Sequence, residues 1–373
     1  MTENDCATPP AVPEPIPVLE PRPSASGFAP LVCPAPLSAA AQVLLGHGSG
    51  GKLSAELVRD VFLAAFHNPI LARMDDQAIV SINGSRLAFT TDTFVVKPLF
   101  FPGGDIGSLA VHGTVNDLAM GGARPLFLSA AFIIEEGLSM ETLRAVVRSF
   151  ERAAAAAGVQ VVTGDTKVVE KGSGDGLFIN TSGIGVVPDG VELSASKALP
   201  GDRVLLSGPV GEHGIAILAK REGLEFDCDL ASDSAALHTL VADMLAASRE
   251  IRCLRDPTRG GVSSTLNEIA SQAGVGIEID ERFIPVREEV KGACEMLGLD
   301  PLYVANEGKL IAIVATDAAD CVLAAMRSHP LGAQARMIGT VTAAHPRLVT
   351  MRTTVGPSRI VDMLAGDQLP RIC

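Results

Sequence analysis

The chain is too long for a single ordinary core, and its charge excludes several classes of function. Its 373 residues predict two domains. Hydrophobic residues make up 47% of the chain, but no stretch reaches the roughly 18 to 20 consecutive apolar residues that span a bilayer. A formal net charge of −13 without any basic run argues against binding to nucleic acid. We therefore expect a globular protein that acts neither on nucleic acid nor at a membrane.

The seven cysteines are scattered, with no C-x-x-C pair and no zinc-binding spacing. An odd and unclustered count argues against a disulfide framework and favours a reducing compartment. The first residues lack the basic and apolar segments of a secretory signal, so we expect a cytoplasmic protein. Four cysteines are expected to be buried small hydrophobes: Cys228, Cys253, Cys294 and Cys321.

Proline dominates the beginning of the chain. Ten of the 24 prolines precede residue 39, so residues 1–40 are predicted to be a disordered, proline-rich extension. Folded sequence begins near Ala41, and the alternation of helices and strands restarts after a turn-rich stretch near residues 190–200. We therefore expect an N-terminal domain over residues 41–195, a C-terminal domain over 196–364 and a mobile tail over 365–373.

Helical and strand patterns alternate along both halves. Apolar spacing and terminal glycines predict helices over Leu53–Phe66, Ile106–Met120 and Met140–Ala157. Asn83-Gly84, between two short β-branched runs, predicts a hairpin turn. Further strands are expected over Leu126–Ile134, Val159–Thr163, Leu177–Val187, Val204–Ser207, Gly276–Ile279, Lys309–Ala315 and Met337–Val341. Further helices are expected from about Gly214 and over Ser234–Ala247, Val262–Ala273, Val286–Leu297 and Ala318–Ser328.

A glycine-rich segment, Gly46–Lys52, opens the folded part. It departs from a Walker P-loop because Leu53 stands where the Mg²⁺-binding hydroxyl belongs. Glycines nevertheless let backbone N–H groups approach phosphates, and Lys52 adds positive charge. We therefore assign Gly50, Gly51 and Lys52 to nucleotide binding. The alternative interpretation is a flexible glycine hinge at the start of the domain.

Carboxylates recur at four expected strand ends or turns, which are occupied by Asp75-Asp76, Asp92, Asp117 and Asp165. A single aspartate in a turn usually caps its own backbone. Four such sites in some 90 residues, behind a glycine loop, indicate Mg²⁺-polyphosphate coordination instead. Lys167 follows Asp165 closely and is suited to neutralise charge on a transferred phosphoryl group. The residues alone thus predict a two-domain α/β enzyme that uses Mg²⁺ and ATP.

The chain ends in Pro370-Arg371-Ile372-Cys373. Chain ends are mobile and reachable, so a thiol on such a tail can be loaded in one active site and processed in another. For a terminal cysteine taken alone, an incidental frayed end is the preferred interpretation, because most chain ends are poorly ordered. The enzyme predicted from the rest of the chain favours the carrier interpretation of Cys373.

Several segments resemble a known superfamily. The run Gly113–Ala123, with Asp75-Asp76 and Thr91-Asp92, is similar to the ATP-binding set of the aminoimidazole ribonucleotide synthetase (PurM-like) superfamily. Within it, a combination of segments resembles the HypE family of hydrogenase maturation factors over about residues 43–373. These segments are His47–Gly51, Thr163–Val168, Asp256–Gly261, Asn306–Gly308 and the terminal Pro-Arg-Ile-Cys. The terminal cysteine narrows the resemblance to HypE.

The resemblance implies a fold, an activity and partners. The fold is a two-domain α/β (α+β) PurM-like architecture that forms a homodimer through the sheet of the N-terminal domain, with nucleotide near the interface. A HypF-type carbamoyltransferase would load a carbamoyl group onto Cys373 as a thiocarboxamide. This chain would dehydrate it with ATP to a thiocyanate, and the cyano group would pass to iron on a HypC–HypD complex for a [NiFe]-hydrogenase.

The resemblance also assigns residues to Mg²⁺ and ATP. The metal candidates are Asp75, Asp76, Asp92, Asp117 and Asp165. Asn116 would help to position the nucleotide, together with Asp92, Asp117 and Asp165, while the loop around Lys52 would close over the phosphates. Lys167 is our candidate for stabilising the phosphoryl group.

Chemistry at nitrogen needs a general base, for which Glu307 is our candidate. A glutamate in a turn before a strand is the alternative interpretation. Arg259 either contacts phosphate or pairs with Asp256. His213 either faces the tail or is a structural or capping histidine, and we prefer the structural role.

Two classes of alternative remain open. Within the superfamily, a thiamine-monophosphate kinase has no use for a terminal thiol. A selenophosphate synthetase usually carries a reactive Cys or selenocysteine in the N-terminal glycine loop, where this chain has His47 and Ser49. The other class is a non-enzymatic thiol carrier, against which the aspartate set and Lys167 argue.

Overall fold

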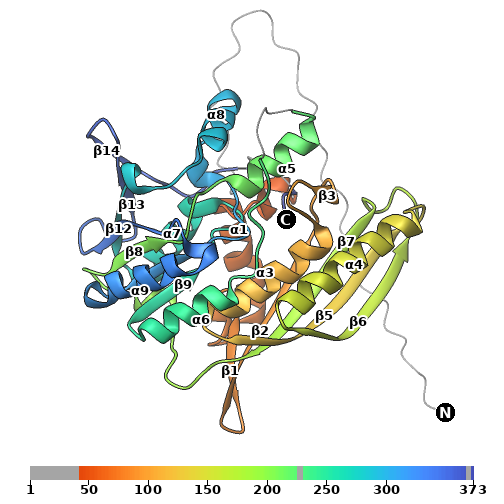
Figure 1. Cartoon of the computed structure of the whole chain (residues 1–373), viewed down its shortest axis with the longest axis horizontal. Helices are drawn as coiled ribbons and strands as arrows, with labels where there is room; N and C mark the ends of the chain where they lie inside the picture. The colour runs from red at the N-terminus through yellow and green to blue at the C-terminus, as the bar shows by residue number, and fades with distance from the viewer. Residues whose placement is uncertain (1–41, 225–229, 367–370) are drawn as a thin grey trace, which may run out of the picture. The chain divides into compact units, whose positions relative to one another are not determined.

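The computed structural model describes residues 42–224, 230–366 and 371–373. Within this part, a five-stranded and a seven-stranded sheet with helices packed on them form a mixed α/β structure, as predicted (Figure 1). The proline-rich extension expected over residues 1–40 lies outside the described residues. No helix of the described segments is long and apolar enough to cross a membrane.

The first sheet has the strand order β1-β2-β7-β5-β6. Its strands are β1 (Ala78–Ile82), β2 (Ser85–Phe94), β5 (Arg124–Glu135), β6 (Gln160–Val169) and β7 (Leu177–Val186). The hairpin predicted at Asn83-Gly84 is confirmed, because Ile82 pairs with Ser85 and both turn residues have positive φ. A short ribbon, β3 (Phe100–Phe101) and β4 (Gly104–Asp105), leads into the next helix.

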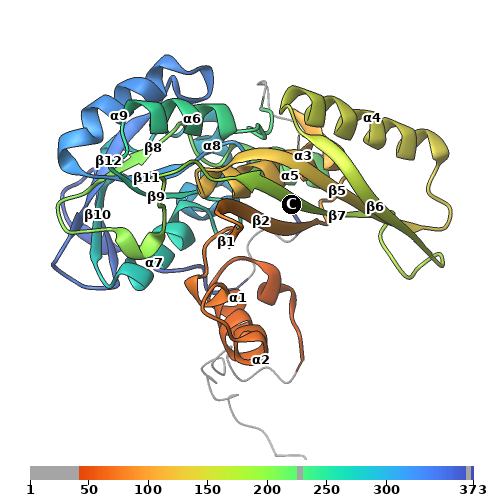
Figure 2. The same cartoon turned by 90° about the horizontal axis from the view of Figure 1, so that it is seen from below.

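Two helices, α3 (Ile106–Met120) and α4 (Met140–Ala156), cover one face of this sheet (Figure 2). The predicted bounds of α3 are confirmed. Asp105 caps its first turn by accepting hydrogen bonds from the backbone N–H groups of Gly107 at 2.8 Å and Ser108 at 3.4 Å. The opposite face leaves large apolar side chains exposed: Phe89, Phe127, Ile133 and Ile184. This apolar face is open in the single chain.

Strand β6 runs past its predicted end. The sequence predicts a strand over Val159–Thr163 and a turn at Asp165, but β6 continues and pairs Asp165 with Ala131 and Lys167 with Ile133. Gly164 permits this pairing because a Cβ at that position would overlap the carbonyl oxygen of Ala130. Asp165 and Lys167 therefore lie within the edge strand of the sheet.

The second sheet has the order β14-β13-β10-β12-β8-β11-β9. Its strands are β8 (Arg203–Leu206), β9 (Ile251–Arg255), β10 (Gly276–Asp280), β11 (Ile311–Val314), β12 (Arg336–Thr342), β13 (Val349–Arg352) and β14 (Ser358–Ile360). Its helices are α5 (Glu212–Glu222), α6 (His238–Ala247), α7 (Gly261–Ala273), α8 (Glu288–Leu297) and α9 (Thr316–Ser328). Strands β9, β13 and β14 were not predicted.

The two sheets share a core. Leu118 and Met120 of α3 belong to the same buried cluster as Leu240 and Met244 of α6. Each sheet falls within one of the two predicted domains, whose boundaries stay a prediction. The shared core fixes α3 against the second half of the chain, which matters because α3 carries candidate site residues.

The N-terminal helix and the cysteines differ in part from expectation. Residues 52–66 are helical, as α1 (Lys52–Leu57), a π-helical turn (Val58–Leu63) and α2 (Ala64–Phe66). Phe62 and Phe66 are exposed, so its apolar side is uncovered in the described chain. Cys253 and Cys294 are buried as predicted, and Cys228 lies outside the described residues. The prediction for Cys321 is wrong, because that residue of α9 is exposed.

The cap of α3 yields a stability test. Asp105→Ala removes a buried carboxylate that satisfies two backbone N–H groups, so it should lower the free energy of unfolding by about 1 to 2 kcal/mol. Ser139→Ala is the matched control, since Ser139 caps α4 through one exposed hydrogen bond to the N–H of Thr142. Urea denaturation followed by circular dichroism measures both. Equal losses for the two variants would contradict the dependence on the α3 cap.

Candidate active site

Acidic residues from both halves of the chain approach one another. Asp76 precedes β1, Asp92 lies on β2, and Asp117 lies on α3. The hydroxyl of Thr90 lies 2.8 Å from a carboxylate oxygen of Asp117 and 3.0 Å from the carbonyl oxygen of Asp76. From the second half, Asp256 follows β9 and Glu307 precedes β11. The charge of Asp256 raises the pKa of Asp117, and the charges of Asp256 and Asp92 raise the pKa of Glu307. We call Asp76, Asp92, Asp117, Asp256 and Glu307 the acidic cluster.

Burial makes this cluster costly to ionise. It raises the pKa of Asp117 well above its usual range, and the charges of Asp256, Asp92 and Asp76 raise it further. Burial likewise raises the pKa of Asp256 to about 6. One oxygen each of Asp76 and Glu307 is buried without a hydrogen-bond partner within the described segments. A cluster of this kind is stabilised by a cation, and oxygen ligands of this type suit Mg²⁺.

The cluster does not form a complete metal cage. Among the described residues, no group of three His, Cys, Asp or Glu side chains is arranged to hold a metal ion. This agrees with the usual behaviour of Mg²⁺, which takes one or two carboxylates and completes its shell with water and substrate phosphates. The donor set therefore fits Mg²⁺ that arrives with a polyphosphate.

The two adjacent aspartates have different partners. Asp76 forms an ion pair with Arg255, whose guanidinium also lies 2.7 Å from Glu268. Asp75 instead pairs with Arg73 at 2.9 Å and accepts a hydrogen bond from Ser194 at 3.2 Å. Asp76 therefore belongs to the cluster, whereas Asp75 is engaged at its margin.

Asp165 and Lys167 lie apart from the cluster within one chain. They form an ion pair with each other at 2.5 Å, and their side chains are 64% and 67% exposed. Strand β6, which carries them, is separated from β2 and Asp92 by β7 and β5. The structure therefore does not bring these two predicted site residues to the other candidates in a single chain.

Asn116 serves the backbone around Glu307. Its side-chain NH₂ donates to the carbonyl oxygens of Ala235 at 3.0 Å and Glu307 at 3.2 Å, and its oxygen accepts from the N–H of Leu237 at 2.8 Å. Both amide hydrogens are thus used within the protein. Asn116 therefore positions this backbone, and its predicted part in nucleotide binding stays a prediction.

Asp233 holds the other side of the same peptide. Its carboxylate accepts hydrogen bonds from the N–H groups of Glu307 at 3.1 Å and Gly308 at 3.2 Å, and from the ammonium of Lys309 at 2.9 Å. Gly308 is required here because a Cβ would overlap the carbonyl oxygen of Asp233. The backbone of Glu307 is therefore fixed from both sides by Asn116 and Asp233. Sequence reasoning missed Asp233, which lies 74 residues away in the chain.

Glu307 combines a fixed backbone with an unsatisfied side chain. Only 2% of the residue is exposed, and one of its carboxyl oxygens has no partner among the described residues. Burial raises its pKa well above the usual range, while Arg259 opposes that shift. A buried carboxyl that can exchange a proton favours the functional interpretation over a glutamate that only serves a turn.

The glycine-rich segment packs against two other parts of the chain. A Cβ on Gly50 would overlap the carbonyl oxygen of Arg259, and one on Gly51 would overlap that of Leu364. Close backbone approach therefore requires both glycines. The ammonium of Lys52 pairs with Asp362 at 2.5 Å in a largely exposed position. The segment thus links the turn at Arg259 to the start of the tail, and Lys52 is not directed to the cluster in this structure.

The end of the tail lies inside the site. The N–H groups of Val95 and Lys97 donate to the carbonyl oxygens of Cys373 at 2.9 Å and Arg371 at 3.2 Å. His213 lies 2.7 Å from the carbonyl oxygen of Ile372 through Nε2, and burial lowers its pKa, so the neutral ring donates there. The structure thus supports the interpretation of His213 that we did not prefer. The mobility predicted for the tail stays a prediction.

Cys373 and Arg259 meet at the acidic cluster. Burial raises the pKa of the Cys373 thiol to about 12, with Arg259 opposing the shift and Glu307 and Asp92 adding to it. The charge of Cys373 is in turn the main cause that raises the pKa of Arg259. Arg259 donates to the carbonyl oxygen of Gly48 at 2.9 Å and forms no ion pair with Asp256 among the described residues. Arg259 is thus a cation beside the thiol.

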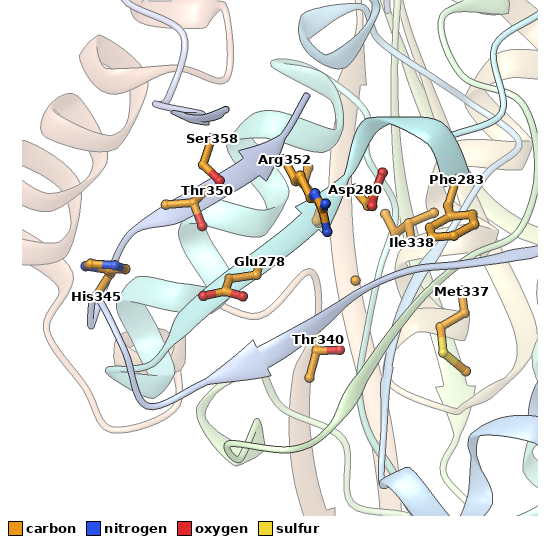
Figure 3. A pocket seen from close by; sticks show the side chains of 12 residues that line it. Glu278, Asp280, Phe283, Met337, Ile338, Thr340, His345, Thr350, Arg352 and Ser358 are labelled. Carbon is orange, nitrogen blue, oxygen red and sulfur yellow. The ribbon is translucent and has the colours of Figure 1, made fainter. Parts of the chain in front are cut away.

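Two hollows on the chain are not lined by any residue of the acidic cluster. One of 410 Å³ lies over β10, β12 and β13, and its lining includes Glu278, His345 and Arg352 (Figure 3). None of the predicted site residues lines it. Another hollow of 420 Å³ borders Asp233 and Lys309, on the network that supports Glu307.

Comparison with known proteins agrees with this arrangement. Residues 74–187 match the family model of the N-terminal domain of AIR synthase related proteins, and residues 200–350 match that of the C-terminal domain. The carbamoyl dehydratase HypE of Cupriavidus necator is 59% identical over 330 residues, which cover 88% of this chain and 94% of that protein.

Two solved structures are similar over most of their length. A HypE–HypF complex contains a chain that is 52% identical, with a TM-score of 0.79 over 83% of this chain and 99% of that one. A HypE in complex with ATP is 50% identical, with a TM-score of 0.75 over 89% of this chain and all of that one. The chain therefore belongs to the HypE family of carbamoyl dehydratases, among the proteins related to AIR synthase.

Proposed function

We propose that this chain uses ATP to dehydrate a carbamoyl group, carried on Cys373 as a thiocarboxamide, to a thiocyanate. The cyano group then supplies the iron of a [NiFe]-hydrogenase. The observation that carries the proposal is the position of the terminal thiol beside Arg259 and Glu307 at the acidic cluster. The similar HypE that was solved with ATP supports the nucleotide.

The chemistry assigns a step to each group. The carbamoyl oxygen is a poor leaving group, so it first takes the γ-phosphoryl group of ATP. Nitrogen loses one of its two protons as the oxygen is phosphorylated and ADP is released, which leaves an S–C(OPO₃)=NH group. Phosphate then departs as the second proton is removed from nitrogen, so the products are S–C≡N, ADP, hydrogen phosphate and the proton taken by the base. Glu307 is positioned to take that proton, and Arg259 to neutralise charge on the phosphorylated oxygen.

Mg²⁺ is part of the proposal through the cluster. Asp92, Asp117 and Asp256 are the candidate carboxylates, of which one or two would hold the ion together with the ATP phosphates, and the ion would offset the phosphate charge. Without such a charge, these buried carboxylates repel one another. Asp76 contributes through its free oxygen, since its other oxygen pairs with Arg255.

Two partners follow from the chemistry of the thiol. A HypF-type carbamoyltransferase is the enzyme that loads Cys373, which is consistent with the similar HypE that was solved with HypF. A HypC–HypD complex that carries iron would receive the cyano group. The tail end seen here, in which Ile372 is 4% exposed and Cys373 is half-buried, is the state that we assign to dehydration, because it limits the access of water to the thiol.

A homodimer accounts for the open sheet face and for Lys167. Phe89, Phe127 and Ile184 form an exposed apolar row across three paired strands. Asp165 and Lys167 pair with Ala131 and Ile133 of β5. These two β5 residues follow Phe127 by four and six positions, and an even spacing along a strand places side chains on the same face. We therefore propose that two copies pack through these sheets and that Lys167 stabilises the phosphoryl group transferred to the carbamoyl group on the partner copy's tail.

The role of Glu307 is tested by Glu307→Gln. The variant should accept a carbamoyl group from the transferase normally but convert it at least about 100-fold more slowly, because the amide cannot take the proton. Glu278→Gln, in the distant hollow over β10, is the control and should behave like the unchanged protein. Mass spectrometry of the tail measures both steps. Normal conversion by Glu307→Gln would remove this residue from the mechanism.

The placement of Lys167 across the dimer is tested by complementation. Lys167→Ala and Cys373→Ala should each be inactive, but a re-associated mixture should recover about one quarter of the wild-type activity. Half of its dimers are mixed, and each mixed dimer contains one site with both residues if the site is shared. Co-expression with two affinity tags supplies the mixed dimer. No recovery in purified mixed dimers would place Lys167 and Cys373 in the same chain's site.

A further inference from the structure

We propose that Asp175, Phe178 and Lys97 form a binding site for Arg371, and that this site holds a C-terminal Arg-Ile-Cys segment with its thiol in the active site. We call these three residues the arginine clamp. The inference depends on the proposed function only for its purpose, which is to retain a loaded tail during dehydration. Asp175, Phe178 and Lys97 carry none of the proposed catalytic steps.

The tail end lies beside residues 95–97 and is held there by two backbone hydrogen bonds. Carbonyl oxygens two residues apart, on Arg371 and Cys373, accept from N–H groups two residues apart, on Lys97 and Val95. Ile372 is 4% exposed and belongs to the core cluster that includes Ile215 and Val290. Backbone pairing and burial of Ile372 thus fix the register of the thiol.

The arginine clamp contacts Arg371, the one charged side chain among residues 371–373. A terminal nitrogen of Arg371 pairs with Asp175, and its Nε donates to the carbonyl oxygen of Val95 at 3.2 Å. The guanidinium carbon lies 5.9 Å from the centre of the Phe178 ring, within the range of a cation–π contact. A planar, branched cation makes all three contacts together, which a lysine cannot do. The clamp is therefore selective for arginine.

The clamp is anchored away from the acidic cluster. Asp175 lies between β6 and β7, Phe178 lies on β7, and the ammonium of Lys97 holds Asp175 at 3.1 Å. The side chains of Arg371 and Asp175 are 28% and 31% exposed, so the pair is shielded but reachable. A transferase that needs the thiol can therefore release the tail by taking Arg371.

The test measures how often Cys373 leaves the site. The full-length protein, without nucleotide or partner, is treated with iodoacetamide at pH 8, and Asp-N digestion yields the peptide over residues 367–373 for quantification. Asp175→Asn should raise the alkylation rate of Cys373 by roughly fivefold to tenfold. Phe178→Leu should raise it by about twofold to threefold, because only the ring contact is lost.

Two further variants make the result specific. Glu170→Gln changes an equal charge at an exposed position near the same β6–β7 connection, and it should leave the rate unchanged. Arg371→Lys alters only the tail, cannot unfold the body, and should resemble Asp175→Asn. Unchanged alkylation in both Asp175→Asn and Arg371→Lys would overturn the clamp and leave the proposed dehydratase untouched. If Glu307→Gln converted the carbamoyl group normally while the clamp variants raised the alkylation rate, the clamp would be supported and the proposed role of Glu307 in dehydration would be contradicted.

Discussion

The account depends on the burial of several carboxylates around one terminal thiol. Asp117, Asp256 and Glu307 lie where burial and mutual repulsion oppose ionisation, and Arg259 is the cation that faces both them and Cys373. Such an arrangement is unfavourable for a purely structural core. It is suited to a site that receives a cation with phosphates and passes a proton to a carboxylate. The buried carboxylates that reduce the stability of the fold are thus the groups to which we assign the chemistry.

The fold holds this cluster together by joining its two halves. Helix α3 presents Asp117 from the first half and packs into a core shared with α6. The preceding residue of the same helix, Asn116, fixes the backbone at Glu307 from one side, while Asp233 fixes it from the other. The glycines at 50 and 51 bring a third segment against Arg259 and Leu364. Local backbone contacts, and not long flexible side chains, therefore set the positions of the reacting groups.

Features set by local physics could be predicted from the sequence. The hairpin at Asn83-Gly84 follows from the positive φ that its turn needs, and the bounds of α3 follow from apolar spacing and the glycines after it. Asp76, Asp92 and Asp117 were found because carboxylates beside strand ends favour Mg²⁺-phosphate sites. The terminal cysteine was singled out by its place on a reachable chain end, and the family resemblance, which the comparisons confirm, added its carbamoyl chemistry and the segment that contains Glu307.

Features set by distant contacts could not be predicted. The contacts of the Asn116 amide with the backbone of Ala235 and Leu237 have no signal in the sequence, because these residues lie about 120 positions away. Asp165 seemed to lie in a turn because Gly164 usually signals one, whereas here it allows close approach to β5. The tail end showed no packing signal, since the surfaces that receive Ile372 and Arg371 come from residues 95–97, Asp175 and His213.

The central claim is that Cys373 carries the substrate through an ATP-driven dehydration. Its most direct test is a time course of intact-protein mass spectrometry with the carbamoyltransferase, carbamoyl phosphate and ATP, with the tail peptide sequenced. The account predicts an adduct of about 43 Da on Cys373 that loses about 18 Da to become one of about 25 Da only when ATP is present to act on the loaded chain. A chain that consumes ATP on a small molecule while Cys373 stays unmodified would contradict it.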